Sequence, residues 1–401
     1  MNGAIVVLNA GSSSIKFAAY ACDAASLALS GRLLHGEIDG SGADAKLLAW
    51  DAAGAALHAD GLADTGGTPQ GEDRALGLLF EWLARQLPGR SVVAVGHRVV
   101  HGGERFVVPV RVDDAVLREL DALSPLAPLH QPHNLAAIRA IARLHPALPQ
   151  VASFDTAFHA TLPWLAHTYA LPARLRDAGV RRYGFHGLSY EYIAGTLPAR
   201  LGAQADGRIV VAHLGNGASL CGLRERRSVA TTMGFTALDG LMMGTRCGSL
   251  DPGVVLYLQA TLGMSLGEVQ RLLYQESGLL GVSGLSADMR TLEAAATPAA
   301  EAAIALFVHR ISTELGALAA ALGGLDGLVF TAGIGEHSAA VRTRVCAAAA
   351  WLGVEIDDTA NRTHAQRIDG AGSRVSVHVI PTDEEIMLAR HACEVLAPRS
   401  A

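Results

Sequence analysis

The chain has 401 residues, of which 50% are hydrophobic, and it carries a formal net charge of -6 at pH 7. This length exceeds one ordinary hydrophobic core and predicts two domains. The acidic balance excludes a general nucleic-acid-binding protein, which needs a basic surface, so an anionic ligand must be bound by locally placed cations.

The five cysteines are scattered and include no CxxC pair. Isolated thiols in odd number are typical of a reduced cytoplasmic protein rather than of a disulfide framework or a zinc site. The N-terminal apolar run is interrupted at Asn9 and has no basic region before it. No uninterrupted apolar segment reaches the roughly 18 to 20 residues of a membrane span. We therefore expect a soluble, cytoplasmic protein that binds neither nucleic acid nor a membrane.

Hydrophobic patterns along the chain predict strands that alternate with helices. Runs rich in Val and Ile predict strands at residues 5–8, 92–95, 107–110, 209–212, 328–332 and 375–380. Stretches rich in Ala and Leu predict helices at residues 72–86, 135–144, 299–322 and 384–396. Residues 36–71, rich in Gly, Ala and Asp, predict a weakly specified β-hairpin region or a surface loop. The alternation predicts an α/β fold with large buried sheets.

Two glycine-rich turns follow predicted strands and are suited to binding phosphate. In the first, VVLNAGSSSIKF, an apolar run stops at Asn9 and opens into Gly11, three serines and Lys16. Backbone N–H groups, hydroxyls and an ammonium group then face one small volume, which can bind nucleotide phosphates without a Walker motif. The second turn, VVAHLGNGAS at residues 210–219, repeats this pattern. Two such loops predict two related lobes around one nucleotide.

Polar residues in three other stretches have both a functional and a structural interpretation. The guanidinium of Arg98, in GHRVVHGGE, can bind a carboxylate or phosphate in bidentate fashion. The same sequence is equally well explained by a structural alternative, in which Arg98 is a surface arginine on a turn. In APLHQPHN, a turn bounded by prolines, His130 and Asn134 lead into a helix, and a helix cap explains this stretch at least as well as a functional role. Asp155, in SFDTAFHATLP, ends an apolar segment, where it either faces a binding site or caps a helix.

Four glycine-rich or acidic stretches later in the chain are candidates for the same site. RRYGFHG contains His186, and MMGTRCGSLDPG contains Arg246 between glycines. The glycines of TAGIGEHS let the backbone approach a nucleotide, although they also suit a tight turn. The carboxylates of IPTDEE either complement a helix dipole or reach a magnesium ion.

Ten motifs in order make the chain resemble the acetate kinase (acetokinase) family, within the superfamily of actin, hsp70 and sugar kinases. They are NAGSSSIKF, GHRVVHGGE, PLAPLH, FDTAFH, RRYGFHG, HLGNGAS, GLMMGTR, SGLSADMR, TAGIGE and PTDEE. The resemblance implies two ribonuclease H-like lobes of the actin-like ATPase fold with a cleft between them, and a homodimer. It assigns residues 1–152 and 385–401 to a carboxylate-side lobe completed by the C-terminal helix, and residues 153–384 to a nucleotide-binding lobe.

The implied reaction is reversible, direct in-line phosphoryl transfer from ATP to acetate, giving acetyl phosphate and ADP. It uses Mg²⁺, for which Mn²⁺ can substitute. Transfer to a carboxylate requires neutralisation of charge on the phosphoryl oxygens more than it requires a base. The acceptor, with an ordinary pKa of about 4, is already ionised. Asp155 is therefore expected to position the nucleophile, the metal or a protonated neighbour.

The family pattern assigns a role to each matching position. The catalytic residues are Asp155, His186 and Arg246, and the metal is held by Asn9 and Glu384, directly or through water. Arg98 binds the carboxylate, and a small pocket of Val100, Leu129, Phe185 and Ala237 receives the methyl group. Phosphate and nucleotide contacts fall on Ser12, Ser14, Lys16, His213, Leu214, Gly215, Asn216, Gly217, Asp288, Met289, Arg290, Gly333, Ile334, Gly335, Glu336 and His337.

This chain departs from the family pattern at several positions. Gln131 stands where Asn is usual, Leu188 and Tyr190 replace Thr and His, Ser249 replaces Asp, and His337 replaces Asn. Ala237 stands where proline is usual. The smaller side chain leaves room for one more methylene, worth about 1 kcal/mol of apolar contact, which predicts propionate activity.

Alternative functions differ in the ligand that the site accepts. A kinase that prefers propionate or another short-chain acid has the same fold and motifs. An hsp70-type ATPase or a sugar kinase belongs to the same superfamily, but the long substrate-binding extension of hsp70 is absent. The set of Arg98, His186 and Arg246 suits a small anion better than the hydroxyls of a sugar.

Overall fold

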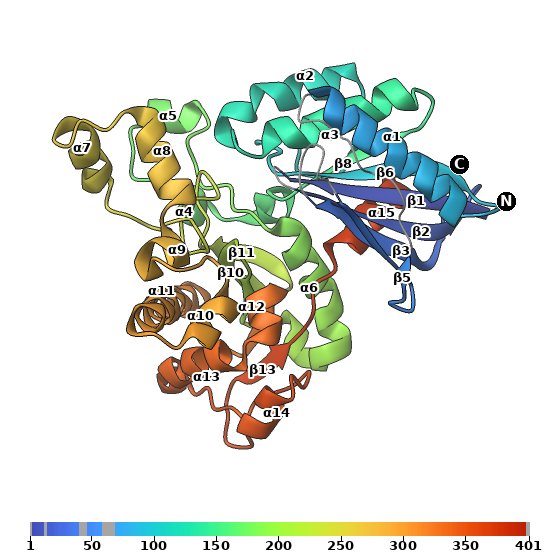
Figure 1. Ribbon diagram of the computed structural model, residues 1–401. Coiled ribbons are helices and arrows are strands. Elements are labelled where there is room, and N and C mark those ends of the chain that lie inside the picture. Colours follow the sequence, from blue (N-terminus) through green and yellow to red (C-terminus); the bar gives the residue numbers. More distant parts are fainter. Residues whose placement is uncertain (1, 12–13, 40–45, 58–68, 398–401) are drawn as a thin grey trace. The chain divides into compact units, whose positions relative to one another are not determined.

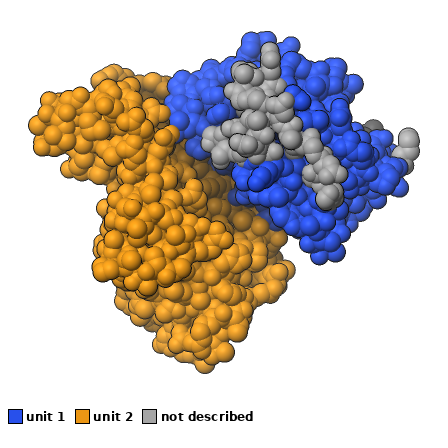
Figure 2. Space-filling model, in the orientation of Figure 1, with its two compact units in different colours: residues 1–157, 383–401 blue, residues 158–382 orange. Residues whose placement is uncertain are grey.

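The computed structural model describes residues 2–11, 14–39, 46–57 and 69–397. It divides into two compact units, unit 1 with residues 1–157 and 383–401 and unit 2 with residues 158–382 (Figures 1 and 2). Each unit contains its own sheet, so the α/β fold with two lobes is confirmed.

Unit 1 is built on one mixed sheet, which has the strand order β5-β4-β3-β2-β1-β6-β8-β7 in the described part of the chain. Its strands are β1 (Asn2–Ala10), β2 (Ser14–Asp23), β3 (Leu29–Asp39), β4 (Lys46–Asp51), β5 (Ala56–Leu57), β6 (Ser91–Val99), β7 (Val110–Arg111) and β8 (Gln150–Phe154). Its helices are α1 (Pro69–Gln86), α2 (Asp114–Ala122), α3 (Gln131–Leu144) and α15 (Glu384–Leu396). Strands β1 to β5 pair antiparallel in sequence order, whereas β1, β6 and β8 are parallel.

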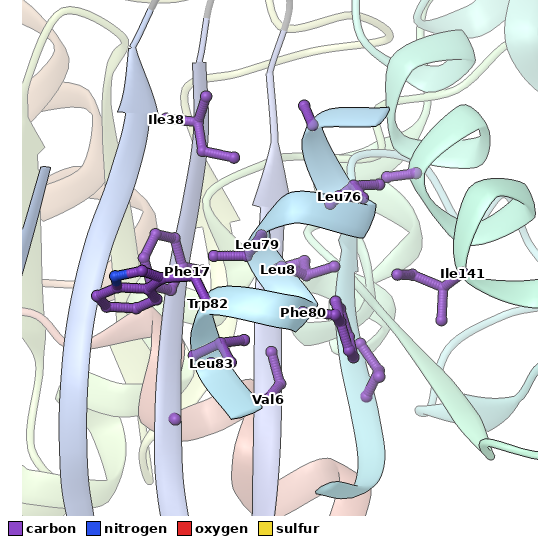
Figure 3. Packing of buried hydrophobic residues seen from close by; sticks show 14 of the residues in the cluster. Val6, Leu8, Phe17, Ile38, Leu76, Leu79, Phe80, Trp82, Leu83 and Ile141 are labelled. Atoms are coloured by element: carbon purple, nitrogen blue, oxygen red, sulfur yellow. The ribbon is translucent and has the colours of Figure 1, made fainter. Parts of the chain in front are cut away.

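Both faces of this sheet are covered by helices. Successive side chains of a strand point to opposite faces, and Val6 and Leu8 join a core formed with Leu79 of α1 and Ile141 of α3 (Figure 3). Helix α15 packs on β1, β6 and β8. A Cβ on Gly96 would lie only 2.9 Å from the carbonyl oxygen of Leu388 in α15. Glycine therefore allows this helix to lie close against β6.

Unit 2 has a smaller sheet, with the order β11-β10-β9-β12-β13 among its described strands. These are β9 (Ile209–Leu214), β10 (Ala218–Arg224), β11 (Arg227–Thr231), β12 (Gly327–Thr331) and β13 (Ser376–Val379). The helices are α4 (Trp164–His167), α5 (Ala173–Asp177), α6 (Gly187–Leu201), α7 (Pro252–Ala260), α8 (Leu266–Gln275), α9 (Gly278–Ser283), α10 (Met289–Ala295), α11 (Pro298–Leu322), α12 (Ala332–His337), α13 (Ala339–Ala348) and α14 (Asp358–Arg362).

The two sheets share one topology. In unit 1, the antiparallel strands β3, β2 and β1 are followed by the parallel strands β6 and β8. In unit 2, β11, β10 and β9 are followed in the same way by β12 and β13. This repeat agrees with the two related lobes expected from the two phosphate loops.

Helix α11 is long and apolar enough, by length and composition alone, to cross a membrane. Its buried residues include Ile304, Phe307 and Leu315, and the helix packs against α9, α13 and β10. It is therefore interpreted as a core helix of unit 2.

Two stretches of regular structure differ from the expectation. Only Val110 of the predicted strand 107–110 belongs to a strand, because Val107 and Val108 point to solvent and Pro109 has no N–H to pair. In the region 36–71, β4 pairs with β3 and β5 with β4, so the described residues up to 57 form a β-meander at the edge of the sheet, and residues 69–71 already belong to α1.

Candidate functional site

Three polar side chains of unit 1 converge where parallel strands end. Asn9 follows Leu8, which pairs with His97 of β6, and Arg98 in turn pairs with Ser153 of β8. The carboxyl ends of parallel strands meet at one edge of a sheet, which is where α/β proteins bind ligands. Arg98 hydrogen-bonds to Asn9, 89 residues before it, and to Asp155, 57 residues after it, so the strand ends join distant parts of the sequence.

The guanidinium of Arg98 holds Asp155 in a bidentate pair. Nε donates to Oδ1 at 3.1 Å and to Oδ2 at 3.0 Å, and Nη2 donates to Oδ2 at 2.5 Å. On the other side, Nη1 donates to Oδ1 of Asn9 at 3.1 Å. The Asp155 side chain is 2% exposed and that of Arg98 is 19% exposed. Burial opposes the charge of Arg98, but the Asp155 carboxylate outweighs it and raises the pKa of Arg98.

The loop after Arg98 is held by two buried side chains of α3. The amide of Asn134 accepts from N–H of Val100 at 3.0 Å and donates to the carbonyl of Ala10 at 2.6 Å. Gln131 accepts from N–H of His101 at 3.1 Å and donates to its carbonyl at 3.0 Å. Of the stretch interpreted as a helix cap, His130 takes the N-cap position of α3 without a side-chain cap hydrogen bond, whereas Asn134 lies inside the helix and connects the ends of β1 and β6.

Glu384 lies in the first turn of α15, directly after the capping residue Asp383. Burial raises the pKa of Glu384 to about 7, and the negative charges of Asp155 and Glu385 add to this effect against Arg98 and Lys16. A divalent cation would relieve this accumulation of negative charge. The oxygen donors of Asn9 and Glu384 are of the kind that Mg²⁺ prefers. Among the described residues, no group of three or more His, Cys, Asp or Glu forms a metal site.

In unit 2, two stacked histidines stand beside the second glycine-rich turn. The rings of His186 and His213 lie 4.1 Å apart, centroid to centroid, at an angle of 19°. Nδ1 of His186 is 2.8 Å from the hydroxyl of Ser219, and Nδ1 of His213 is 2.8 Å from that of Ser189. Both rings are thus fixed through Nδ1.

Arg246 converges on the same turn. A Cβ on Gly217 would lie 2.8 Å from Nη2 of Arg246 and 3.2 Å from Nε2 of His186. The missing side chain therefore lets both nitrogens approach the backbone of this turn. Nη1 of Arg246 donates to the carbonyl of Ala237 at 2.6 Å, which ties the guanidinium to the loop expected to shape the acyl pocket.

His159 supports the His186 loop and was not singled out from the sequence. Its Nε2 is 2.9 Å from the carbonyl of Phe185, and its Nδ1 is 2.8 Å from the hydroxyl of Ser228. The ring packs so closely that a Cβ on Gly184 would lie 2.6 Å from it. Only its position in the FDTAFH motif, four residues after Asp155, could have drawn attention to it.

A cavity of about 660 Å³ in unit 2 brings together half of the predicted phosphate and nucleotide contacts. It is lined by Gly215, Asn216, Ala287, Asp288, Met289, Arg290, Glu293, Gly333, Ile334, His337 and Ser338. The turn between β9 and β10, the start of α10, helix α12 and the capping residue of α13 thus meet around one volume.

Three predicted nucleotide contacts are enclosed by, or hydrogen-bonded to, other parts of unit 2. Leu214 is fully buried in β9, and Gly335 is buried in α12. The carboxylate of Glu336 accepts from N–H of Ala332 at 2.7 Å and from N–H of Thr382 at 3.2 Å. These three residues do not line the cavity, and their contact with the nucleotide stays a prediction.

The remaining predicted residues divide between the two units. In unit 1, Lys16 is exposed on β2, opposite Asn9 in the register, and Ser14 is half-buried. Ser12 lies outside the described residues. Of the expected acyl pocket, Val100 and Leu129 belong to unit 1, whereas Phe185 and Ala237 belong to unit 2.

Comparison with known proteins identifies the family of this chain, because the sequence pattern of the acetokinase family matches residues 4–390. The chain belongs to the acetokinase family. An acetate kinase of Rhodopseudomonas palustris is 56% identical over 396 residues, 98% of each chain. A propionate kinase of Francisella tularensis has a similar structure, with a TM-score of 0.89 and 35% identity over 98% of this chain and 100% of that one. An acetate kinase of Porphyromonas gingivalis has a TM-score of 0.82 at the same identity and coverage.

Proposed function

We infer that this member of the acetokinase family is an acetate kinase, which transfers a phosphoryl group from ATP to acetate and back. The observation that carries this inference is the 56% identity to an acetate kinase over 98% of both chains. The inference is supported by two features of the structure. The pair of Arg98 and Asp155 supplies a cation that can bind a carboxylate, and the cavity of unit 2 supplies space for a nucleotide.

In the forward direction, a carboxylate oxygen of acetate bonds to the γ-phosphorus as the bond from phosphorus to ADP breaks, in line with the attack. We assign the acetate carboxylate to Arg98. Asp155 occupies the edge formed by Nε and Nη2, and Asn9 accepts one proton of Nη1, so acetate is expected at the remaining protons of Nη1 and Nη2. Asp155 then acts as a positioning residue that fixes the guanidinium.

We assign charge neutralisation on the transferring group to His186 and Arg246, whose nitrogens converge beside Gly217. Donors held in advance where charge develops are a major source of catalysis in phosphoryl transfer. Asn9 and Glu384 would hold Mg²⁺ or Mn²⁺, directly or through water, and the bound ion would neutralise phosphate charge. Mg²⁺ usually binds only one or two protein oxygens and takes its remaining ligands from water and phosphate.

Propionate is the second candidate substrate. Ala237 is smaller than proline, and the similar structure from Francisella tularensis is that of a propionate kinase. The acetate kinases at higher sequence identity favour acetate as the main substrate.

We propose that two copies of the chain assemble through α7. Its segment VVLYL is apolar, yet none of the residues of α7 is buried, and Leu256 and Tyr257 are 67% and 54% exposed. An apolar helix without a buried face is typical of an interface, and a self-complementary patch suits a twofold homodimer. The variant Leu256→Glu should give monomers in light scattering, whereas Val108→Glu, at an exposed valine of unit 1, should not. A monomeric parent protein would contradict the assignment.

An acyl hydroxamate assay with ATP and Mg²⁺ tests the activity on formate, acetate, propionate and butyrate. Phosphorylation of glycerol is measured separately as a control for sugar-kinase activity. We expect product with acetate and a smaller yield with propionate. ATP hydrolysis that unfolded peptide stimulates, without any hydroxamate, would instead support the hsp70-type alternative. We place the enzyme in the cytoplasm, in line with its free cysteines.

A further inference from the structure

The loop between β11 and α7 carries two residues of the proposed site on its two sides. Ala237, on the outgoing side, is expected in the acyl pocket, and Arg246 stands on the returning side. Nη1 of Arg246 donates to the carbonyl of Ala237 at 2.6 Å. The position of one side against the other therefore decides where the wall of the acyl pocket lies.

The returning side of this loop is anchored to α8. The N–H of Cys247 donates to the carbonyl of Leu273 at 3.1 Å, and the hydroxyl of Thr245 donates to the carbonyl of Tyr274 at 2.8 Å. These hydrogen bonds hold the residues on either side of Arg246 independently of the outgoing side.

The outgoing side is joined to the returning side by a clasp that consists of Asp239, Gly240 and Ser249. The N–H of Ser249 donates to the carbonyl of Gly240 at 2.9 Å, and Oγ of Ser249 accepts from the N–H of Gly240 at 3.1 Å. The same Oγ is 2.7 Å from Oδ1 of Asp239. An ionised carboxylate can only accept, so Ser249 donates its hydroxyl proton to Asp239.

The charged and titratable groups around Asp239 leave little positive charge for a second carboxylate. Nη1 of Arg182 lies 3.5 Å from Oδ2 of Asp239. Burial raises the pKa of Tyr169, of Cys247 and of Glu314 in α11, and the negative charge of Asp239 adds to each of these shifts. The positive charge of Arg182 opposes the shift of Glu314, so this cation already acts on two carboxylates.

Ser249 stands where the family resemblance implies aspartate. An ionised aspartate at this position could accept from the N–H of Gly240 but could not donate to Asp239, and two carboxylates in contact repel each other. An asparagine has nearly the shape of aspartate, yet its amide can both accept from Gly240 and donate to Asp239. The clasp therefore depends on a donor at position 249 and not on the size of the side chain.

We propose that Ser249, acting through Asp239, is a positioning residue that holds the Ala237 side of the loop against the Arg246 side and thereby fixes the wall of the acyl pocket. The proposal rests on the acetate kinase activity and on the acyl-pocket role of Ala237 given above. Because the Arg246 side has its own anchors, loss of the clasp should weaken binding of the acid more than it slows the transfer step.

Ser249→Asp and Ser249→Asn form a matched pair of variants that tests the proposal by kinetics. At about pH 8, we expect KM for acetate to be about 3- to 10-fold higher in Ser249→Asp than in Ser249→Asn, with kcat and KM for ATP within about twofold. The ratio should shrink toward about pH 5.5, because the two carboxylates then share a proton. Equal KM values at pH 8, or a ratio that does not change with pH, would overturn the proposal.

Ser26→Ala is the control for the loss of a serine–aspartate hydrogen bond as such. The hydroxyl of Ser26 donates to Asp23 at 3.0 Å in an exposed turn of unit 1. This variant should keep the KM for acetate of the parent protein. An equal rise of KM in Ser26→Ala and in Ser249→Asp would mean that the effect does not come from the clasp.

Amide hydrogen exchange of the full-length protein gives a result that does not depend on activity. Residues 236–240 should exchange about 3- to 10-fold faster in Ser249→Asp than in Ser249→Asn, whereas residues 243–247 should exchange equally in both. Equal exchange of residues 236–240 would contradict the clasp. If the parent protein makes no acyl phosphate from acetate, the proposed function is wrong, and the exchange comparison alone then decides whether Ser249 holds the loop.

Discussion

At the scale of single residues, the site of unit 1 depends on a buried ion pair whose two members have different tasks. Arg98 is partly accessible and can bind a substrate, whereas Asp155 is almost completely enclosed. A buried charge that loses its partner is costly, because the remaining ion is left without compensation. Asp155 therefore matters to the orientation of Arg98 and to the stability of unit 1 at the same time.

The variant Asp155→Asn tests this double role. We expect turnover to fall at least about 100-fold, and the free energy of unfolding to fall by about 3 kcal/mol, because the Arg98 charge remains buried without a carboxylate. Activity assays and urea unfolding measure the two effects. As a control, Asp206→Asn breaks an exposed pair with Arg226 and should cost about 1 kcal/mol or less. Near-normal turnover with unchanged Mg²⁺ affinity would contradict the positioning role of Asp155, and an unchanged free energy of unfolding would contradict its role in stability.

Ala237 is expected to set the preference for the acyl chain. Restoring the family residue by Ala237→Pro should lower the ratio of kcat/KM for propionate to that for acetate about fivefold, since the ring fills the space of one methylene. Ala237→Gly should not lower it. If this ratio of propionate to acetate activity is no higher in the parent protein than in Ala237→Pro, the propionate hypothesis is wrong.

At the scale of elements, α3 couples two strand ends that carry site residues. Asn134 joins the carbonyl of Ala10, one residue after Asn9, to N–H of Val100, two residues after Arg98. We expect Asn134→Ala to lower the free energy of unfolding by about 2–4 kcal/mol, because two buried backbone groups lose their partner. Leu144→Ala, at a partly exposed position of the same helix, should change it much less. Unfolding curves and KM for acetate together show whether the strand ends separate.

The sequence predicts elements well where one local pattern decides the outcome. The Val-rich core of β1 is recognisable, but β2, with FAAYA, has no such pattern and becomes a strand because it pairs with β1 along its full length. The same distinction holds in the site. Asn9, Arg98 and Asp155 are predictable as polar residues at strand ends, whereas His159 and Ser219 are defined by partners 26 and 33 residues away, Phe185 and His186.

At the scale of the whole molecule, buried neutral histidines connect stability to pH. Burial lowers the pKa of His97 and of His159 to about 4, from an ordinary value of 6.5. The unfolded chain therefore binds more protons below pH 6.5, so stability is complete above that value and is lost as the pH falls toward 4. Each ring can contribute up to about 3 kcal/mol to this loss.

His159→Gln should reduce this dependence, although the variant is less stable at neutral pH. We expect the midpoint of thermal unfolding to fall less steeply between pH 6.5 and 4.5 in the variant than in the parent protein. Equal slopes would show that His159 is not held neutral. His145→Gln, at a half-buried ring just after α3, serves as the control.

The returning helix α15 has a consequence for synthesis of the protein. Unit 2 is one continuous stretch, residues 158–382, whereas unit 1 needs residues 383–397 to cover a face of its sheet. The unit that leaves the ribosome first is therefore the one that is completed last. Until α15 emerges, Val7 and Gly96 on the uncovered face remain open to water and to other newly made chains, so a premature stop near residue 382 would leave a whole unit 2 joined to an aggregation-prone unit 1.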